Sequence, residues 1–455
     1  MSSELRKRLN QAGGSIPESW PVVSLDSLLK DSKSISVGVM YPGPNTPGGI
    51  PLLKVGDIRG GLISHEPSYC ISEATNSKHK RTQLQGDEIL ITLVGNPGEC
   101  VLVESHMAGW NPARAIAVLR LKETQLRVYL KAFIESAAGK HMIDSVLNTT
   151  VQKTLNLKDI RQLPIPIPPF EVIKSISEFS AALNNRIAIL RETNATLESI
   201  AQAIFKSWFV DFDPVRAKQE GRIPDGMDEA TAALFPDCLE DSELGLVPKG
   251  WEIESVGDAV EFVGGGTPNT KEPSYWEPGE HCWTTPKDLS GIAAPILLAT
   301  ERKLSSKGLA KVSSGLLPVG TLLLSSRAPI GYLAIIQTPM AINQGYIAML
   351  PDSQLPPLFM LYWCRQNMET IKGRANGSTF MEISKKAFRP IPILVPPPTI
   401  VRAFTDVAGS LFDRLVEHET MAQNLSSIRD TLLPRLVSGK LLLPEAEAEL
   451  EAMAS

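Results

Sequence analysis

The stretch PIPIPPFEVIKSISEFSAALNNRIAILRETNATLESIAQAIFKSWF, residues 164–209, decides the fold. After its proline cluster neither Pro nor Gly occurs until Pro214, so the sequence predicts one long helix. Apolar and small side chains recur along this helix in alternating steps of four and three, at Leu183, Ile187, Leu190, Asn194, Leu197, Ala201, Ile204 and Trp208. This spacing is a heptad seam and is typical of a helix that packs on another helix.

A second helix of the same design follows Pro396-Pro397-Pro398, with Gly409 near its start and Pro434 near its end. Its seam lies 228 positions after the first, at Leu411, Leu415, His418, Ala422, Leu425, Arg429, Leu432 and Leu436. Each apolar face is too narrow to stand alone, so we expect the two helices to pack on each other. If a two-fold axis relates the two halves, the pair is an antiparallel coiled coil.

Three seam residues are polar, and each has more than one interpretation. Asn194 either sets the register of the coiled coil or lies at its wet edge. His418 and Arg429 are expected at the rim of the seam or against a partner, in preference to a metal ion.

The repetition extends over the rest of the chain. Matched segments are residues 16–20 with 247–251, 52–58 with 283–289 (Asp57 with Asp288), 86–92 with 320–326, and the tetrapeptide PIPI at 164–167 with 390–393. Solenoid repeats have periods of roughly 20–50 residues, so matches more than 220 positions apart indicate duplication of a whole module. The alternative is two unrelated domains with similar edges.

Each module begins with a globular part of mixed α/β (α+β) character. Strand-like runs are Glu88–Val94, Ala115–Leu121, Thr321–Ser325 and Tyr346–Leu350, and helical stretches are Leu126–Leu147 and Pro357–Lys372. The predicted organisation is a globular domain at 15–165, a helix at 166–212, an acidic linker at 213–245, a globular domain at 246–395, a helix at 396–440 and an acidic tail at 441–455. The Gly and Pro content of the linker marks it as a connection and not a core element.

Composition narrows the class of protein. The 455 residues are 43% hydrophobic and 21% charged, as in ordinary globular proteins. No apolar run approaches the ~18 residues of a membrane helix, and the N-terminus lacks the apolar segment of a secretory signal. The five scattered cysteines include no CxxC pair, which indicates reduced thiols and a cytoplasmic location.

Charge is segregated along the chain. The net charge is −5, yet both globular parts carry +2, while residues 166–245 carry −7 and 396–455 carry −4. A nucleic-acid ligand therefore stays possible, because phosphate contact needs basic clusters only locally. Such clusters are Lys78-His79-Lys80-Arg81, Lys372-Gly373-Arg374, and Lys385-Lys386 with Arg389.

Sequence signatures of catalysis are mostly missing. The stretch GGGTP at 264–268 lacks the Lys-Ser/Thr of a phosphate-binding loop. No Asn-Pro-Pro-Tyr-type motif of an amino-methyltransferase occurs, and no His pair has metal-ligand spacing. We therefore interpret the chain as a binding protein without a metal site. The alternatives are a DNA adenine methyltransferase with its own cofactor site and a duplicated adaptor that binds protein.

Several stretches identify a family. FKSWFVDFDPVRAKQEGRIPDGM (205–227), FPDCLEDSELGLVPKGW (235–251), GGGTPNTKEPSYW (264–276) and LLPRLVSG (432–439) resemble the specificity (S) subunit of type I restriction–modification enzymes. The opening of the first module, ISVGVMYPGPNTPGG (35–49), departs from the GGTP form of the second. This departure is expected where two domains read different sequences.

The resemblance implies a function and a set of partners. Each globular domain would be a target recognition domain that reads one half of a bipartite, asymmetric double-stranded DNA target. The helices would act as a spacer and dock two modification (methyltransferase) subunits, which carry S-adenosylmethionine and methylate adenine. Restriction (translocase/endonuclease) subunits would add ATP- and Mg-dependent translocation and cleavage. The chain itself would be non-catalytic and bind no cofactor.

Base readout needs Arg, Lys, Asn, Gln or hydroxyl side chains on loops. The DNA-binding candidates are Lys54, Arg59, Lys78, Lys80, Arg81 and Arg114 in the first domain, and Thr267, Thr285, Lys287, Arg327, Asn343, Gln344, Arg374 and Ser378 in the second. For each candidate, a surface or strand-end role is the alternative. The partner-docking candidates are Phe205, Trp208, Phe209 and Phe212, whose alternative is packing against the opposing helix.

Overall fold

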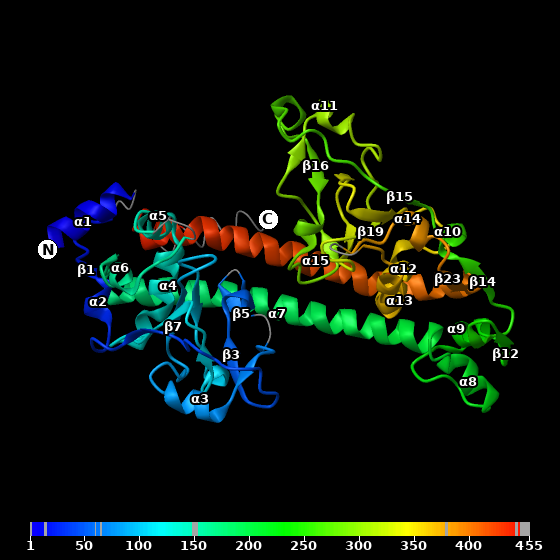
Figure 1. Ribbon diagram of the computed structural model, residues 1–455, viewed down its shortest axis with the longest axis horizontal. Helices are drawn as coiled ribbons and strands as arrows, with labels where there is room; N and C mark the ends of the chain where they lie inside the picture. Colours follow the sequence, from blue (N-terminus) through cyan, green and yellow to red (C-terminus); the bar gives the residue numbers. More distant parts are fainter. Residues whose placement is uncertain are drawn as a thin grey trace. The chain divides into compact units, whose positions relative to one another are not determined.

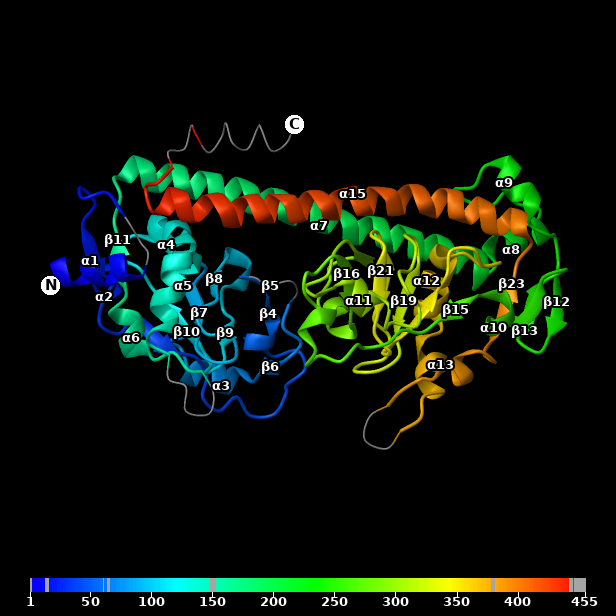
Figure 2. The same cartoon turned by 90° about the horizontal axis from the view of Figure 1, so that it is seen from above.

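The computed structural model describes residues 2–12, 16–59, 61–63, 66–147, 153–377, 381–441 and 445. The chain forms two compact units (Figures 1 and 2). Unit 1 is residues 1–187 with 424–455, and unit 2 is residues 188–423. The long helices α7 (Phe170–Phe209) and α15 (Pro398–Val437) are divided between the units. Each unit therefore contains one globular domain and a segment of both helices.

The paired helices confirm the predicted seam. Every predicted seam residue of α7 and α15 is buried or half-buried. Within unit 2, Asn194 meets His418, and Phe205, further along α7, meets Phe404, which lies earlier in α15. The two helices therefore run antiparallel, as predicted.

The buried Asn194 decides between its two interpretations. Its side chain is 3% exposed. Its Nδ2 donates to the Leu415 carbonyl at 3.3 Å, and His418 Nδ1 lies 3.0 Å from its Oδ1. In unit 1, Arg429 Nη1 donates to Asn184 Oδ1 at 2.9 Å. Asn194 is thus a buried polar contact of the seam, and not a residue at its wet edge.

The globular domain of unit 1 is built on an antiparallel sheet in the order β2-β10-β7-β8. Its strands are β2 (Ile35–Val37), β10 (Ile116–Leu119), β7 (Ile89–Thr92) and β8 (Cys100–Leu102). A smaller sheet, β6-β3-β9, contains the parallel pair β3–β9. The remaining strands are β6 (Cys70–Ile71), β3 (Ile50–Leu53), β9 (Asn111–Pro112), β4 (Ile58–Arg59), β5 (Leu62–Ile63), and the pair β1 (Val22–Ser24) and β11 (Pro164–Pro166).

Unit 2 repeats this arrangement with a five-stranded sheet, β15-β22-β19-β20-β17, and the smaller sheet β18-β16-β21. The first sheet comprises β15 (Phe262–Val263), β22 (Tyr346–Met349), β19 (Leu322–Ser325), β20 (Leu333–Ile336) and β17 (Ile296–Leu297). The others are β18 (Lys303–Leu304), β16 (His281–Thr284), β21 (Met340–Ile342), and the pairs β14 (Glu252–Ser255) with β23 (Pro392–Val395) and β12 (Leu239–Ser242) with β13 (Gly245–Pro248). The shared strand order supports duplication of a whole module.

Strand pairing corrects one detail of the repeat. Ser24 pairs with Pro164 in unit 1, and Ser255 pairs with Pro392 in unit 2. Pro164 is thus equivalent to Pro392 and not to Pro390, the partner given by the tetrapeptide match. Side chains alternate along a strand, so a slip of two residues leaves the same face toward the core. The sequence match therefore looked correct although its register was wrong.

Shorter helices flank the sheets. They are α1 (Ser2–Gln11), α2 (Leu25–Leu28), α3 (Glu73–Lys78), α4 (Arg127–Glu135), α5 (Ala137–Asp144) and α6 (Leu157–Arg161) in unit 1, and α10 (Val256–Ala259), α11 (Ser306–Leu309), α12 (Pro357–Gln366), α13 (Met368–Gly373) and α14 (Lys385–Phe388) in unit 2. The predicted helix Leu126–Leu147 breaks at Ser136, whose hydroxyl oxygen caps α5 by accepting from the Gly139 N–H at 3.2 Å. The predicted helix Pro357–Lys372 breaks at Asn367, whose side chain does not cap α13 and donates instead to the Trp363 carbonyl.

The acidic linker is more ordered than predicted. It forms α8 (Asp213–Gln219), α9 (Glu229–Leu234) and the β12–β13 hairpin. Val215 is fully buried and Phe235 is 2% exposed, and both belong to the hydrophobic core of unit 2. The prediction of a connection outside the core is therefore wrong, because apolar residues within this acidic segment pack inward.

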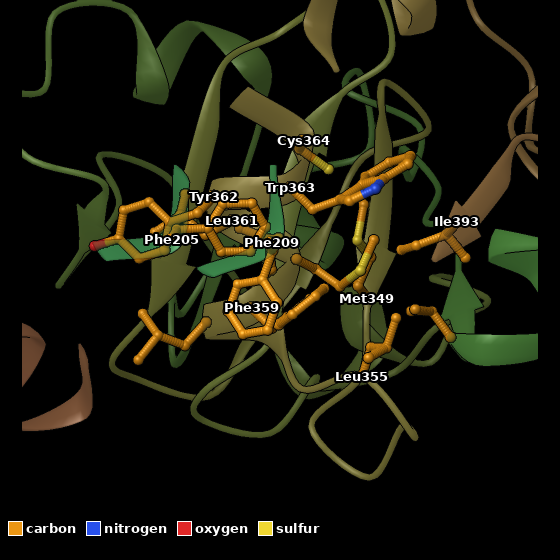
Figure 3. Close-up of a cluster of buried hydrophobic side chains, with 14 of the residues drawn as sticks. Phe205, Phe209, Met349, Leu355, Phe359, Leu361, Tyr362, Trp363, Cys364 and Ile393 are labelled. Atoms are coloured by element: carbon orange, nitrogen blue, oxygen red, sulfur yellow. The ribbon is translucent and has the colours of Figure 1, made fainter. Parts of the chain in front are cut away.

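An aromatic cluster joins the helices to the globular domain in unit 2 (Figure 3). The Phe359 ring of α12 lies 5.1 Å from that of Phe205 and 4.9 Å from that of Phe209. Trp208 packs on Phe404 of α15. All four predicted docking aromatics are at most 9% exposed. They therefore form core and not an exposed docking surface. The first three pack against Phe404 of the opposing helix, as in the alternative, whereas Phe212 packs on Trp251.

No helix of the described residues is both long and apolar enough to cross a membrane.

Candidate nucleic-acid interface

Each globular domain carries an equivalent loop that follows a closely packed glycine. A Cβ on Gly38 would lie 2.0 Å from the Pro112 carbonyl oxygen, and one on Gly265 would lie 1.9 Å from that of Ile342. The next residue in each loop donates its N–H to the same carbonyl, from Val39 at 2.8 Å and from Gly266 at 3.0 Å. The first module therefore keeps the essential glycine although it lacks the GGTP sequence.

These loops place candidate residues in contact. Thr267 Oγ1 donates to Gln344 Oε1 at 2.6 Å, and both residues are exposed. In the first domain, Arg114 Nη1 lies 3.9 Å from the sulfur of Met40, and both residues are likewise exposed. Met40 is not among the predicted DNA-binding residues, because Met is not a typical base-reading residue.

Four candidates of the second domain meet at one pocket of about 340 Å³. Thr285, Lys287, Arg327 and Asn343 line it together with Tyr332. Three of the four already have partners within the domain. The Thr285 hydroxyl donates to Asp288 Oδ2 at 2.9 Å, Asn343 Oδ1 accepts from the Gly345 N–H at 2.9 Å, and Arg327 pairs with Glu382 at 3.4 Å.

Two further candidates of this domain lie elsewhere. Arg374 is an exposed residue at the C-terminal end of α13 and does not line the pocket. Ser378 lies outside the described residues.

The recurring carboxylates Asp57 and Asp288 shape the loops. Asp57 Oδ2 accepts the N–H of Lys54 at 2.7 Å, and Asp288 Oδ2 accepts that of Thr285 at 2.7 Å. Each carboxylate thus satisfies a backbone donor at the start of a 3₁₀ turn, η1 (Val55–Asp57) and η5 (Pro286–Leu289). Their repetition in the sequence reflects this turn.

The basic cluster of the first domain lies at the C-terminal end of α3, where Lys78 ends the helix and Lys80 and Arg81 follow it. Lys78, Lys80 and Arg81 are exposed, but Arg81 Nε and Nη2 both donate to the Lys33 carbonyl, at 3.2 and 2.9 Å. Figure 1 shows α3 at the end of its globular domain remote from the long helices. Arg81 therefore holds the loop that contains Lys33, while Lys78 and Lys80 are exposed to solvent.

A buried amide holds α3 in place. Asn111 Nδ2 donates to Asn76 Oδ1 at 2.7 Å, and the Thr82 hydroxyl donates to Asn111 Oδ1 at 2.7 Å. All three residues are at most 4% exposed. Buried polar groups that are fully paired fix a local geometry, so the position of the basic cluster is well defined.

Lys54 and Arg59 complete the first-domain candidates. Lys54 Nζ lies 3.3 Å from the centroid of the Tyr69 ring, a cation–π contact. The Tyr69 hydroxyl donates to the Gly43 carbonyl, so Lys54 lies beside the loop that carries Met40. The backbone of Arg59 is in β4, and its side chain lies outside the described residues.

Sequence reasoning missed two lysines of the second domain. Ser72 caps α3 and Ser305 caps α11, and their hydroxyl oxygens accept from Thr75 N and Gly308 N at 3.2 and 3.1 Å. The helices α3 and α11 are thus equivalent at an offset of 233. Exposed Lys311 corresponds to Lys78, and Lys307 lies on α11 itself. The repeated Ser before each helix was the available signal.

The most displaced pKa values belong to the core. Burial raises the pKa of the Cys100 and Cys364 thiols and of the Tyr129 phenol. Among the described residues, no group of three or more His, Cys, Asp or Glu side chains could hold a metal ion. The exposed loops instead offer hydroxyl, amide and cationic groups, which is the chemistry of base and phosphate contact.

The chain is similar to proteins of one family in every comparison with known proteins. Residues 18–199 and 248–407 match the type I restriction modification DNA specificity domain, which is well over half of the chain. The type I restriction enzyme MjaIX specificity subunit of Methanocaldococcus jannaschii is 34% identical over 183 residues, 40% of this chain and 42% of that subunit. The chain thus spans less than half the length of that relative.

Two further matches extend over more of the chain. The HindI specificity subunit of Haemophilus influenzae is 26% identical over 371 residues, 71% of this chain and 76% of that one. The crystal structure of the type I S subunit from M. genitalium has the same fold, with a TM-score of 0.50 at 17% identity over 92% of this chain and 96% of that chain. The chain therefore belongs to the type I restriction modification DNA specificity family, as its sequence predicts, and is a non-catalytic DNA specificity subunit of a type I restriction–modification system.

Proposed function

We propose that each globular domain reads one half of a bipartite, asymmetric DNA target. The observation that carries this proposal is the pair of equivalent loops that present different side chains. Arg114 and Met40 occupy in the first domain the places of Gln344 and Thr267 in the second. One scaffold with two sets of contact groups suits two half-sites of different sequence.

Phosphate contact comes from lysines that lie on the flanking helices α3 and α11 or within two residues after their ends. Lys78 and Lys80 follow this pattern in the first domain, and Lys307 and Lys311 do so in the second; all four are exposed. The excess of acid resides in the helices and the linker, so the basic groups of the globular domains keep a local positive potential. Phosphate contacts set affinity and position, while the loops supply sequence discrimination.

The helices dock two modification subunits, with S-adenosylmethionine on those subunits and ATP and Mg on restriction subunits. With the aromatic candidates buried, other apolar side chains must supply the contact. Ile189 and Ile200 are 53% and 44% exposed on α7, eleven residues apart and thus on one face of the helix. Val407 and Met421 are exposed on α15. Because its ligand is DNA, the assembly acts in the cytoplasm.

The proposal is tested with the chain assembled with its modification subunits on a random-sequence duplex library. The recovered methylated sequences should share a discontinuous consensus of two specific halves around a nonspecific gap. A single continuous consensus would contradict the bipartite reading. Methyl transfer by the purified chain alone would favour a methyltransferase with its own cofactor site, and protein binding without DNA binding would favour an adaptor.

A further inference from the structure

We propose that Thr267–Gln344 and Met40–Arg114 are equivalent base-reading pairs, in which Gln344 reads an adenine and Arg114 reads a guanine. This inference rests on the proposed function and names the residues that discriminate bases within it. Thr267 acts as a positioning residue for Gln344.

The equivalence of the pairs follows from the backbone. Gly38 packs over the Pro112 carbonyl and Gly265 over that of Ile342. Both Pro112 and Ile342 end the strand that pairs in parallel with the central strand of the smaller sheet. Each member of the two proposed pairs lies two residues after one of these four backbone positions. Met40 and Thr267 follow the two glycines, and Arg114 and Gln344 follow the two strand ends.

Backbone hydrogen bonds hold these segments in place. In the first domain the bonds run both ways, because Val39 N donates to the Pro112 carbonyl and Arg114 N donates to the Val39 carbonyl, at 2.8 and 2.9 Å. Contact groups that project from such a fixed backbone can discriminate, since a loosely held group would adapt to any base.

The hydrogen bond of Thr267 prepares Gln344 for one base. Gln344 Oε1 accepts the hydroxyl proton of Thr267 at 2.6 Å, which fixes the orientation of the amide. The second lone pair of Oε1 and both Nε2 protons are left for a ligand. An amide in this state accepts from the adenine N6 amino group and donates to N7, which is the bidentate contact that distinguishes adenine in the major groove.

The first-domain pair has different chemistry in the same place. Met40 is 42% exposed and its thioether is at most a weak acceptor, so Arg114 keeps the forked N–H donors of its guanidinium. Such donors match the O6 and N7 acceptors of guanine. The apolar end of Met40 beside them suits a neighbouring thymine methyl group.

The test uses the assembled methyltransferase complex and a random-sequence duplex library, with Q344A, R114A, T267V and T267S variants. A bidentate contact discriminates bases by roughly 10- to 100-fold. We expect Q344A to lose selectivity of that size at one A·T pair of the second half-site, with the first half-site unchanged. R114A should do the same at one G·C pair of the first half-site.

The threonine variants separate positioning from folding. T267V should relax selectivity at the same base pair as Q344A, while T267S, which keeps the hydroxyl, should retain it. K311A, at a lysine assigned to phosphate contact, is the matched control and should weaken binding without changing any base preference.

Defined outcomes would overturn the inference. Wild-type selectivity at every position in Q344A or R114A would exclude these residues as readers, and a loss at a G·C pair in Q344A would contradict the adenine assignment. An unaltered T267V would exclude positioning by Thr267. If the wild-type complex gave no bipartite consensus, the proposed function itself would fail, so the two failures are distinguishable.

Discussion

Replacing Gly265 with Ala should separate the loop geometry from general stability. The new Cβ would lie 1.9 Å from the Ile342 carbonyl oxygen and 2.5 Å from its carbon. Ordinary contact begins near 3.4 Å, so one backbone segment must move by about 1.5 Å. Ile342 is held in β21 by parallel pairing with Thr284 of β16. The loop that leads to Thr267 is therefore the segment that moves.

The magnitude of both effects follows from this displacement. Overpacking of a closed site costs typically about 1–3 kcal/mol. For a unit of this size, 1 kcal/mol corresponds to roughly 2–4 °C, so the unfolding midpoint of unit 2 should fall by about 2–12 °C. The bond from Thr267 to Gln344 is 2.6 Å long and would not survive a shift of this size. Selectivity in one half-site should therefore fall while the other is kept.

Gly266→Ala is the matched control, because the nearest atoms to its Cβ are 3.9–4.0 Å away. Thermal unfolding followed by calorimetry measures stability, and selection from a random duplex library by the assembled complex measures half-site selectivity. If G265A and G266A behaved alike in both measurements, the close approach of this loop to Ile342 would have no functional weight and the reasoning would be refuted.

Two further predictions concern the basic cluster and the seam. Changing Lys78 and Lys80 together to Ala should make the negative slope of log affinity against log salt shallower by up to about 1.8, at ~0.9 per phosphate contact. K122A is the control, because Lys122 Nζ donates to the Ser27 carbonyl, and it should leave the slope unchanged. An unchanged slope in K78A/K80A would mean that these two lysines do not contact phosphate. A double-mutant cycle of N194A and H418A, followed by chemical unfolding, should give a coupling of about 0.5–1.5 kcal/mol. Additive effects would mean that the 3.0 Å contact does not stabilise the seam.

Periodicity and duplication were predictable because they are local patterns repeated in order. The seam from Leu183 to Trp208 needed only helical spacing, and the antiparallel direction followed from the repeat. The burial of Phe205 was not predictable, since its neighbour Phe359 is 154 positions away along the chain. An amphipathic helix end looks the same in sequence whether it meets its own domain or a partner.

The candidate site was predictable by residue type but not by role. Most Arg, Lys and Gln candidates are exposed, but Arg327 is half-buried, and the exposed Arg81 bonds with its side chain to its own domain. The Thr285 hydroxyl likewise donates to Asp288 within its own domain. Residue type alone does not predict such bonds, because the geometry of the turn decides which polar groups pair locally. Met40 could not be predicted as a site residue, because what places it there is its contact with Arg114, which lies 74 positions away along the chain.

The central claim is that each globular domain reads one half-site independently. The most direct measurement replaces residues 15–165 with the matching domain of a related specificity subunit of different target and maps methylated adenines in the DNA of cells that express the whole system. One half of the consensus should change to that of the donor while the other half stays as before. A change in both halves, or in neither, would contradict the account.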